Sequence, residues 1–282
     1  MTRIEWVGAD GNALIGDTFG DPGGPPVVLL HGGGQTRHAW GKTGAALAAG
    51  GFYAVAMDLR GHGESAWSPD GQYGLDKFSA DLKTILGHFH TAPAVVGASL
   101  GGLTALLTEG EADPSLLRAV ILVDVAHRLE PEGVLRIVSF MKDKSEEGFA
   151  TLEEAADLIA SYLPHRKRPK DLSGLKKNLR LGDDGRYRWH WDPKFLQGDQ
   201  RIDPALMGTR LRDATINLGV PTLLVRGGLS DILSEEAALE FQQLAPDAEY
   251  IDVASAAHMI AGDRNDIFSD AVCDFLERVI AR

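Results

Sequence analysis

The sequence has a single cysteine, no long apolar run and no excess of positive charge, and each absence excludes a class of protein. Cys273 alone cannot form an internal disulfide, so neither an oxidising compartment nor a thiolate metal site is implied. No stretch reaches the roughly 18 apolar residues of a membrane span. Residues 1–12 alternate polar and apolar side chains and do not resemble a signal peptide. We therefore expect a cytoplasmic protein with no membrane partner.

The charge of the chain is negative overall but unevenly distributed. A formal net charge of −12 argues against a nucleic-acid partner, because phosphate binding requires a basic surface. Residues 128–215 carry 17 Lys and Arg against 15 Asp and Glu, a net charge of +2, whereas the rest carries 11 against 25, a net charge of −14. The middle segment is therefore compositionally a separate piece.

Short apolar runs alternate with helical patterns on both sides of that segment, which is typical of a mostly parallel sheet flanked by helices. The runs predicted as strands are 26–30, 52–57, 94–96, 119–123, 221–225 and 248–253. Apolar residues recur every three or four positions in the segments predicted as helices, which are 39–49, 75–89, 100–111, 234–244 and 266–280. The sequence thus predicts an α/β core formed by residues 1–127 and 216–282.

Residues 128–215 are predicted to form a helical cap inserted into this core. The helical patterns cover 133–144, 152–163, 172–181 and 204–218. An aromatic stretch, 187–191, lies between the third and the fourth of them. The cap also contains a basic cluster, 166–170 together with Lys176 and Lys177. Such a cluster is typical of a solvated face, and the alternative is contact with an anionic partner.

A serine lies in a motif that carries nucleophilic chemistry. The sequence Gly97-Ala98-Ser99-Leu100-Gly101 has the G-x-S-x-G spacing and stands where a predicted strand gives way to a predicted helix. A sharp turn there strains the serine backbone, and glycines are needed where a Cβ would collide with neighbouring elements. The helix N-terminus beside the hydroxyl favours developing negative charge. Ser99 is therefore the candidate nucleophile.

A glycine-rich loop follows the first buried strand. In Leu30-His31-Gly32-Gly33-Gly34-Gln35 the backbone approaches a substrate oxygen closely and aims N–H groups at it, as an oxyanion hole requires. The expected donors are the amides of Leu100 and of Gly33, with Gly34 as the alternative. No Gly-Lys-Ser/Thr ending follows, so a phosphate-binding P-loop is excluded. His31 precedes the loop and is expected to brace it.

Three strings resemble the α/β-hydrolase superfamily: LHGGGQTRHAW at 30–40, MDLRGHGES at 57–65 and VGASLGG at 96–102. The resemblance extends through LVRGGLSDIL at 224–233 and AAHMIAGDRND at 256–266. The subgroup contains bacterial carboxylesterases, haloperoxidase-like perhydrolases and epoxide hydrolases. It implies an α/β-hydrolase fold with a catalytic triad in the chain order serine, acid, histidine. Asp58 and His62 lie in a loop that is structural in this family.

The resemblance assigns the remaining members of the triad. His258 follows the last predicted strand and is the expected base, because a serine hydroxyl needs an adjacent base that a carboxylate orients. Asp231 follows the strand before it and has the position implied for the acid. Asp124 is the rival, since some members of the superfamily place the acid one strand earlier.

These residues indicate a serine hydrolase that cleaves a carboxylic ester or lactone through an acyl-enzyme, with no cofactor or metal. We expect a small, fairly apolar substrate between cap and sheet, where Phe140, Met141, Trp189 and Trp191 line the pocket or simply pack the cap. Serine at position 99 disfavours the aspartyl route of epoxide hydrolases. The alternatives are a carbon–carbon bond hydrolase or a perhydrolase with the same triad, and a low-turnover ligand-binding receptor or regulator. The sequence does not indicate an oligomeric state.

Overall fold

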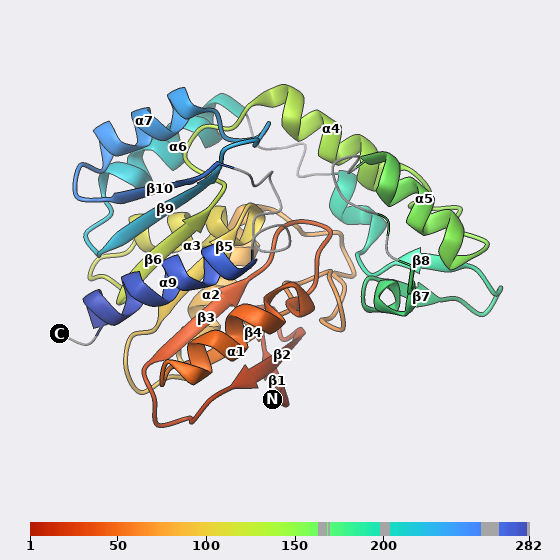
Figure 1. Cartoon of the computed structure of the whole chain (residues 1–282), viewed down its shortest axis with the longest axis horizontal. Helices are drawn as coiled ribbons and strands as arrows, with labels where there is room; N and C mark the ends of the chain where they lie inside the picture. Colours follow the sequence, from red (N-terminus) through yellow and green to blue (C-terminus); the bar gives the residue numbers. More distant parts are fainter. Residues whose placement is uncertain (163–167, 169, 198–203, 255–264, 281–282) are drawn as a thin grey trace.

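The structure is a computed structural model of the whole chain, and it describes residues 1–162, 168, 170–197, 204–254 and 265–280. The larger part of the molecule is a twisted sheet with helices on both faces, and a second part stands beside it (Figure 1). Within the described ranges the sheet has eight strands in the order β1-β2-β4-β3-β5-β6-β9-β10. Strands β1 and β2 pair antiparallel with each other, β2 pairs antiparallel with β4, and the other pairs are parallel.

The strands of the sheet are short and, in its centre, buried throughout. Their bounds are β1 (Thr2–Val7), β2 (Ala13–Phe19), β3 (Pro26–Leu30), β4 (Tyr53–Met57), β5 (Ala94–Ala98), β6 (Ala119–Val123), β9 (Thr222–Gly227) and β10 (Glu249–Val253). Each residue of β3 and β6 is buried, because helices cover both faces of a parallel sheet. The continuous apolar runs that predicted these strands reflect that double burial.

Two apolar clusters occupy the two faces of the sheet. One face packs on α2 (Leu75–Leu86), α3 (Leu100–Gly110), α6 (Pro204–Ile216) and α7 (Glu235–Leu244). The other face packs on α1 (Gly41–Ala49) and α9 (Asn265–Ile280). Alternate residues of β3 serve the two clusters: Val28 and Leu30 the first, Val27 and Leu29 the second. This arrangement confirms the predicted α/β-hydrolase core with helices on both sides of a mostly parallel sheet.

The cap differs from the purely helical insertion that the sequence predicted. It contains α4 (Pro131–Lys142), α5 (Leu152–Tyr162) and the short 3₁₀ helices η2 (Ser173–Lys177) and η3 (Pro193–Gln197). The helix predicted over 172–181 is wrong beyond residue 177, because β7 (Leu179–Leu181) pairs with β8 (Tyr187–Trp189) in an antiparallel hairpin. Burial of Leu179 against Trp189 stabilises the hairpin, and Gly185 has a φ of +76°, which suits its turn.

Helix α6 packs on the core helices α3 and α7. It lies beside α3, where a Cβ at Gly110 would come within 2.2 Å of the Ala214 carbonyl oxygen. In Figure 1 α6 stands with α7, away from α4 and α5. The limits 128 and 215 of the cap stay a prediction, but the last described residues inside them belong spatially to the core.

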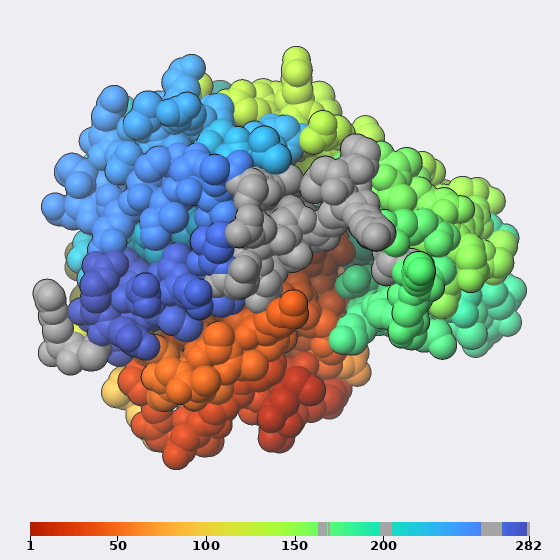
Figure 2. Space-filling model, in the orientation of Figure 1, coloured from red at the N-terminus to blue at the C-terminus, as the bar shows by residue number. Residues whose placement is uncertain are grey.

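Hydrogen bonds join the cap to the core loop that contains Gly61, Gly63 and Tyr73. The backbone N–H of Asp192 donates to the Gly61 carbonyl at 2.8 Å, and the Tyr73 hydroxyl donates to the Asp192 carboxylate at 2.6 Å. Arg180 of β7 donates to the Gly63 carbonyl. Figure 2 shows the cap as a lobe that projects from the core. None of the helices in the described ranges is long and apolar enough to cross a membrane.

Candidate functional site

Ser99 lies at the carboxyl end of β5, in the turn that leads into α3. Its backbone has φ 46° and ψ −113°, which is strained for a residue with a Cβ. Its N–H donates to the Val123 carbonyl at 3.2 Å, and its carbonyl accepts from Leu103 N–H at 2.9 Å. These bonds hold the strained turn, and the serine side chain faces the cavity described below.

The glycines around Ser99 are required by close backbone contacts. A Cβ at Gly97 would lie 2.4 Å from the Gly101 carbonyl oxygen, and a Cβ at Gly101 would lie 2.4 Å from the Leu30 carbonyl oxygen. Both distances are far below any real Cβ contact, and both neighbours are backbone atoms that have no other rotamer. The glycine positions that the motif predicted therefore have a steric cause.

The glycine-rich loop lies across from the start of α3 and lines the same cavity as Ser99. A Cβ at Gly32 would lie 3.3 Å from the Ser99 Cβ, which fixes how closely the loop approaches the serine. Among the described residues no acceptor is found for the backbone N–H of Gly33, Gly34 or Leu100, and all three residues line the cavity. The role of these amides as an oxyanion hole stays a prediction.

Gln35, which sequence reasoning did not single out, closes this loop. Its Oε1 accepts from Gly32 N–H at 3.0 Å, and its own N–H donates to the Gly32 carbonyl at 3.1 Å. His31 is fully buried at the start of the loop and accepts from Leu59 N–H at 3.0 Å through Nε2. Its Nδ1 therefore carries the proton and donates to the Gly32 carbonyl at 2.8 Å. Burial lowers the pKa of His31, so the ring stays neutral and braces the loop.

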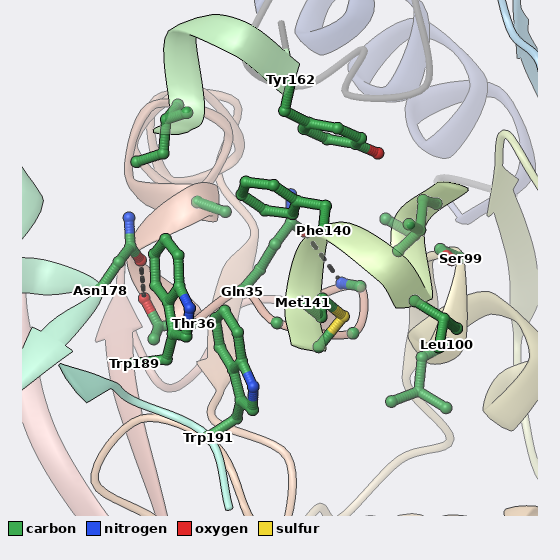
Figure 3. Close-up of a pocket in the computed structure, with 18 of the residues that line it drawn as sticks. Gln35, Thr36, Ser99, Leu100, Phe140, Met141, Tyr162, Asn178, Trp189 and Trp191 are labelled. Atoms are coloured by element: carbon green, nitrogen blue, oxygen red, sulfur yellow. Dashed lines mark hydrogen bonds between the residues drawn. The ribbon is translucent and has the colours of Figure 1, made fainter. Parts of the chain in front are cut away.

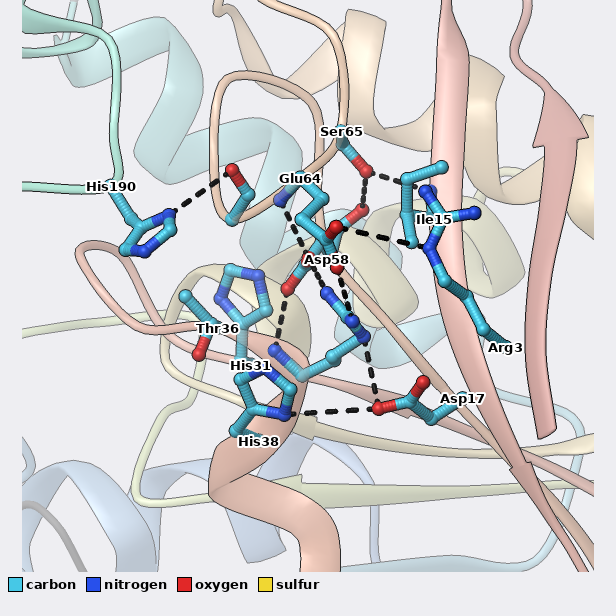
Figure 4. Close-up of polar contacts among 12 residues, drawn as sticks. Arg3, Ile15, Asp17, His31, Thr36, His38, Asp58, Glu64, Ser65 and His190 are labelled. Atoms are coloured by element: carbon cyan, nitrogen blue, oxygen red, sulfur yellow. Dashed lines mark hydrogen bonds and ion pairs between the residues drawn. The ribbon is translucent and has the colours of Figure 1, made fainter. Parts of the chain in front are cut away.

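A buried arginine, Arg37, anchors the residues that follow the loop. Figure 4 shows the nearby carboxylates of Asp17, Asp58 and Glu64. Arg37 donates to the Asp58 carboxylate at 2.5 Å, lies 3.0 Å from the Asp17 carboxylate, and also pairs with Glu64. Its backbone N–H donates to Asp58 at 2.7 Å. The three carboxylates hold Arg37 in place, and so they also position its neighbours in the chain, Thr36 and His38. Asp58 is thus structural, as the family resemblance implied.

The two candidate acids lie beside one loop. Asp124, at the end of β6, is fully buried with φ 52° and accepts from Gly227 N–H at 2.9 Å and from the Ser230 hydroxyl at 2.5 Å. Asp231 is the next residue after that serine. Its side chain is 31% exposed and forms an ion pair with Arg136 on α4. The predicted base, His258, lies outside the described residues.

The cavity above Ser99 has a volume of about 720 Å³. It lies between the carboxyl ends of the strands and the cap, and its walls are mainly apolar side chains of α4, α5, β8 and η3. In Figure 3 Ser99 and Leu100 stand on one side, Thr36 and Asn178 stand on the other, and aromatic rings lie between them. A cavity of this size accommodates a small organic ligand and buries most of its surface.

The four residues predicted to line a pocket do line this cavity: Phe140, Met141, Trp189 and Trp191. They also pack the cap, since the two tryptophan rings stack with centroids 4.7 Å apart. Sequence reasoning missed Tyr162, Asn178 and Phe195, which line the cavity as well. Their signal was absent because each comes from a different cap segment and none lies in a motif.

His62, the histidine of the loop 57–65, is also unsuited to acid–base or metal chemistry. His62 is fully buried, and burial lowers its pKa to about 3, so the ring is neutral. No group of three or more His, Cys, Asp or Glu side chains in the described ranges is placed to hold a metal ion.

Comparisons with known proteins agree with this geometry. A family model of the alpha/beta hydrolase fold matches residues 25–264. The chain is 31% identical to the esterase Rv0045c of Mycobacterium tuberculosis, over 85% of this chain and 78% of that protein. It is 27% identical to the 3-hydroxybutyrate-oligomer hydrolase of Cupriavidus necator, over 85% of each.

A solved structure described as an alpha/beta hydrolase from Novosphingobium aromaticivorans has a TM-score of 0.82 to this chain. The sequences are 26% identical, and the match covers 99% of this chain and 98% of that one. The fold, the strained serine and the family match all lead to the same assignment. The chain is a hydrolase and belongs to the α/β-hydrolase fold family.

Proposed function

We propose that the chain is a serine hydrolase that cleaves a carboxylic ester or lactone of a small, fairly apolar molecule. The observation that carries this proposal is the strained turn that presents Ser99 to an apolar cavity opposite the amides of Gly33 and Gly34. A serine held in this way is suited to attack an acyl carbon whose oxygen lies among backbone N–H groups. The similarity to a protein named an esterase supports the same reaction class.

The proposed reaction has two halves. Ser99 Oγ bonds to the acyl carbon while His258 takes the serine proton, and the oxyanion accepts hydrogen bonds from Leu100 N–H and from Gly33 or Gly34. His258 then gives the proton to the leaving alcohol as the ester C–O bond breaks. Water, activated by the same histidine, hydrolyses the acyl-enzyme. No cofactor is required for either half.

Asp231 is the acid of this proposal, and Asp124 is the alternative. Both lie at carboxyl ends of neighbouring strands, and Ser230 connects them because its hydroxyl donates to Asp124 one residue before Asp231. A carboxylate in this position holds the histidine in the tautomer that accepts the serine proton. The assignment is testable by exchange of either carboxylate for an amide.

The experiment that tests the proposal is a series of p-nitrophenyl esters of increasing acyl length, run beside lactones and beside peracid formation. We expect ester or lactone hydrolysis to exceed peracid formation, and Ser99→Ala to lower kcat by more than about 10⁴-fold. Ser145→Ala, a half-buried cap serine that does not line the cavity, is the matched control and should keep wild-type rates. Absence of hydrolysis across the series, or full activity in Ser99→Ala, contradicts the proposal.

A further inference from the structure

The charged side chains that line the cavity are of one sign. Within the described ranges they are Arg168 and Lys177, with the titratable His38 beside them, and no aspartate or glutamate lines the cavity. The chain as a whole has a formal net charge of −12. A cavity with cationic groups and no described carboxylate is therefore an exception on an acidic protein, and it favours a ligand that carries negative charge.

Two polar side chains lie at the end of the cavity away from Ser99. Thr36 is buried and donates from its hydroxyl to Asn178 Oδ1 at 3.4 Å, and Figure 3 shows this pair across the cavity from Ser99. His38 and Lys177 flank the pair in sequence and line the same cavity. Apolar side chains of the cavity wall separate these polar residues from Ser99.

Among the cationic side chains that line the cavity, Lys177 has no ion-pair partner in the described part of the chain. Arg168 pairs with Asp157 at 2.9 Å, and His38 lies 3.8 Å from Asp17. For Lys177 the described part of the chain offers neither an ion pair nor a side-chain acceptor, and the amide nitrogen of Asn178 likewise has no described acceptor. Burial lowers the pKa of His38, and the charges of Arg37 and Lys177 lower it further, so Lys177 is near enough to act on the imidazole.

We propose that the cavity takes esters whose acyl part ends in a carboxylate, and that Lys177 and the side-chain amide N–H of Asn178 bind that carboxylate, with Thr36 holding the Asn178 amide by its oxygen and His38 beside them. This inference rests on the proposed function. The alcohol leaves after the first half-reaction, whereas the acyl part remains attached to Ser99 until water releases it. An anchor at the far end of the cavity therefore acts on the part of the substrate that stays bound in both halves.

The test uses mono-p-nitrophenyl esters of dicarboxylic acids of increasing length, each paired with the neutral p-nitrophenyl ester of a monocarboxylic acid of the same length. We expect the wild type to prefer the charged ester at one length, at which the acyl chain spans the cavity from Ser99 to Lys177. Lys177→Gln should lower the ratio of kcat/KM for the charged to the neutral ester about tenfold, as expected for loss of one charge-assisted hydrogen bond. The preference should weaken as salt is raised.

Lys176→Gln is the matched control, since Lys176 is the adjacent lysine and is exposed like Lys177, but does not line the cavity. It should leave the ratio unchanged. An equal ratio in wild type and Lys177→Gln, or an equal loss in both variants, overturns the inference. Neutral esters hydrolysed better than charged ones at every length also overturn it.

A binding measurement separates this inference from the proposed function. Ser99→Ala should bind the half-amide of the preferred dicarboxylic acid more tightly than its neutral analogue in calorimetry, and addition of Lys177→Gln should remove the difference. Inorganic phosphate is the second probe, and it should compete weakly because it lacks the apolar chain. If no ester is hydrolysed but this Lys177-dependent binding persists, the esterase proposal fails and the carboxylate site stands. If esters are hydrolysed and the binding difference is absent, the esterase proposal stands and the carboxylate site is overturned.

Discussion

Two of the residues that the sequence singled out have a backbone conformation that costs energy. Ser99 and Asp124 have φ values of 46° and 52°, and they stand at the carboxyl ends of the neighbouring strands β5 and β6. Such strain persists only where surrounding contacts enforce it, and it is concentrated at functional sites. The hydrogen bond from Ser99 N–H to the Val123 carbonyl joins the two turns directly.

The first prediction distinguishes the two candidate acids. Asp231→Asn should lower kcat about 10⁴-fold, because loss of the carboxylate leaves the histidine in the wrong tautomer. Asp124→Asn should cost far less in kcat and should instead lower thermal stability, since Asp124 accepts from Gly227 N–H and from Ser230 in a fully buried position. Steady-state kinetics and a melting curve for each variant give the answer, and the reverse ranking of kcat would assign the acid to β6.

The sequence predicts a residue's role where that role depends on its immediate neighbours in the chain. It does not where the role depends on residues that are distant in sequence. The Ser99 turn is determined by glycines within two positions of it, so a short motif specifies it. The choice between Asp124 and Asp231 depends on which carboxylate faces a histidine that is distant in sequence. Lys177 looked like part of a solvated basic cluster, because its place on the cavity depends on the fold of the cap.

At the element scale most core strands and helices were predictable, because the strands are continuous apolar runs and the helices have apolar residues at every third or fourth position. Strand β3 matches its apolar run, and α9 begins one residue before its predicted start. The cap hairpin was missed because Leu179-Arg180-Leu181 is too short to show alternation clearly. The dipeptide Asp184-Gly185, a hairpin turn signal, was the available indication. Strands β1 and β2 were also missed.

The second prediction concerns α4, the cap helix that contacts the glycine-rich loop. Met141 is 3% exposed, and a Cβ at Gly34 would lie 2.9 Å from its Cε. Met141→Ala should therefore enlarge the cavity beside the loop and raise kcat/KM for longer acyl chains relative to short ones about tenfold, since each methylene in an apolar pocket is worth that much or more. The ester chain-length series measures the shift.

Leu135→Ala is the control on the same helix, because Leu135 is 64% exposed and does not line the cavity. It should leave the chain-length profile as it is in the wild type. A melting curve checks that Met141→Ala is folded, since loss of a buried methionine side chain costs about 2–5 kcal/mol. An unchanged profile in folded Met141→Ala would show that the cap does not set the acyl length here.

At the scale of the whole molecule, buried neutral histidines make stability depend on pH. Burial lowers the pKa of His62 to about 3 and also lowers that of His31. Above pH 6.5 these rings are neutral in both the folded and the unfolded chain. Below it the unfolded chain binds protons that the folded chain does not, so stability is lost as the pH falls from 6.5 towards the folded pKa.

The third prediction follows from that difference in proton binding. The free energy of unfolding in urea should fall below pH 6.5 by about 1.4 kcal/mol per pH unit for each such histidine. In His62→Asn, whose amide replaces the bond from the ring to the Arg60 carbonyl, the fall between pH 6.5 and 5.5 should be smaller by one histidine's share. Identical slopes in wild type and variant would mean that His62 does not carry this linkage.

The most direct test of the account is covalent labelling of the serine. A fluorophosphonate bonds to an activated serine in place of the acyl group, so intact mass should show one adduct per chain, and peptide mapping should place it on Ser99. Ser99→Ala should show no adduct and no ester hydrolysis. An adduct on another serine of the wild type, or full hydrolysis by Ser99→Ala, would contradict the central claim that the strained turn at the end of β5 presents the nucleophile.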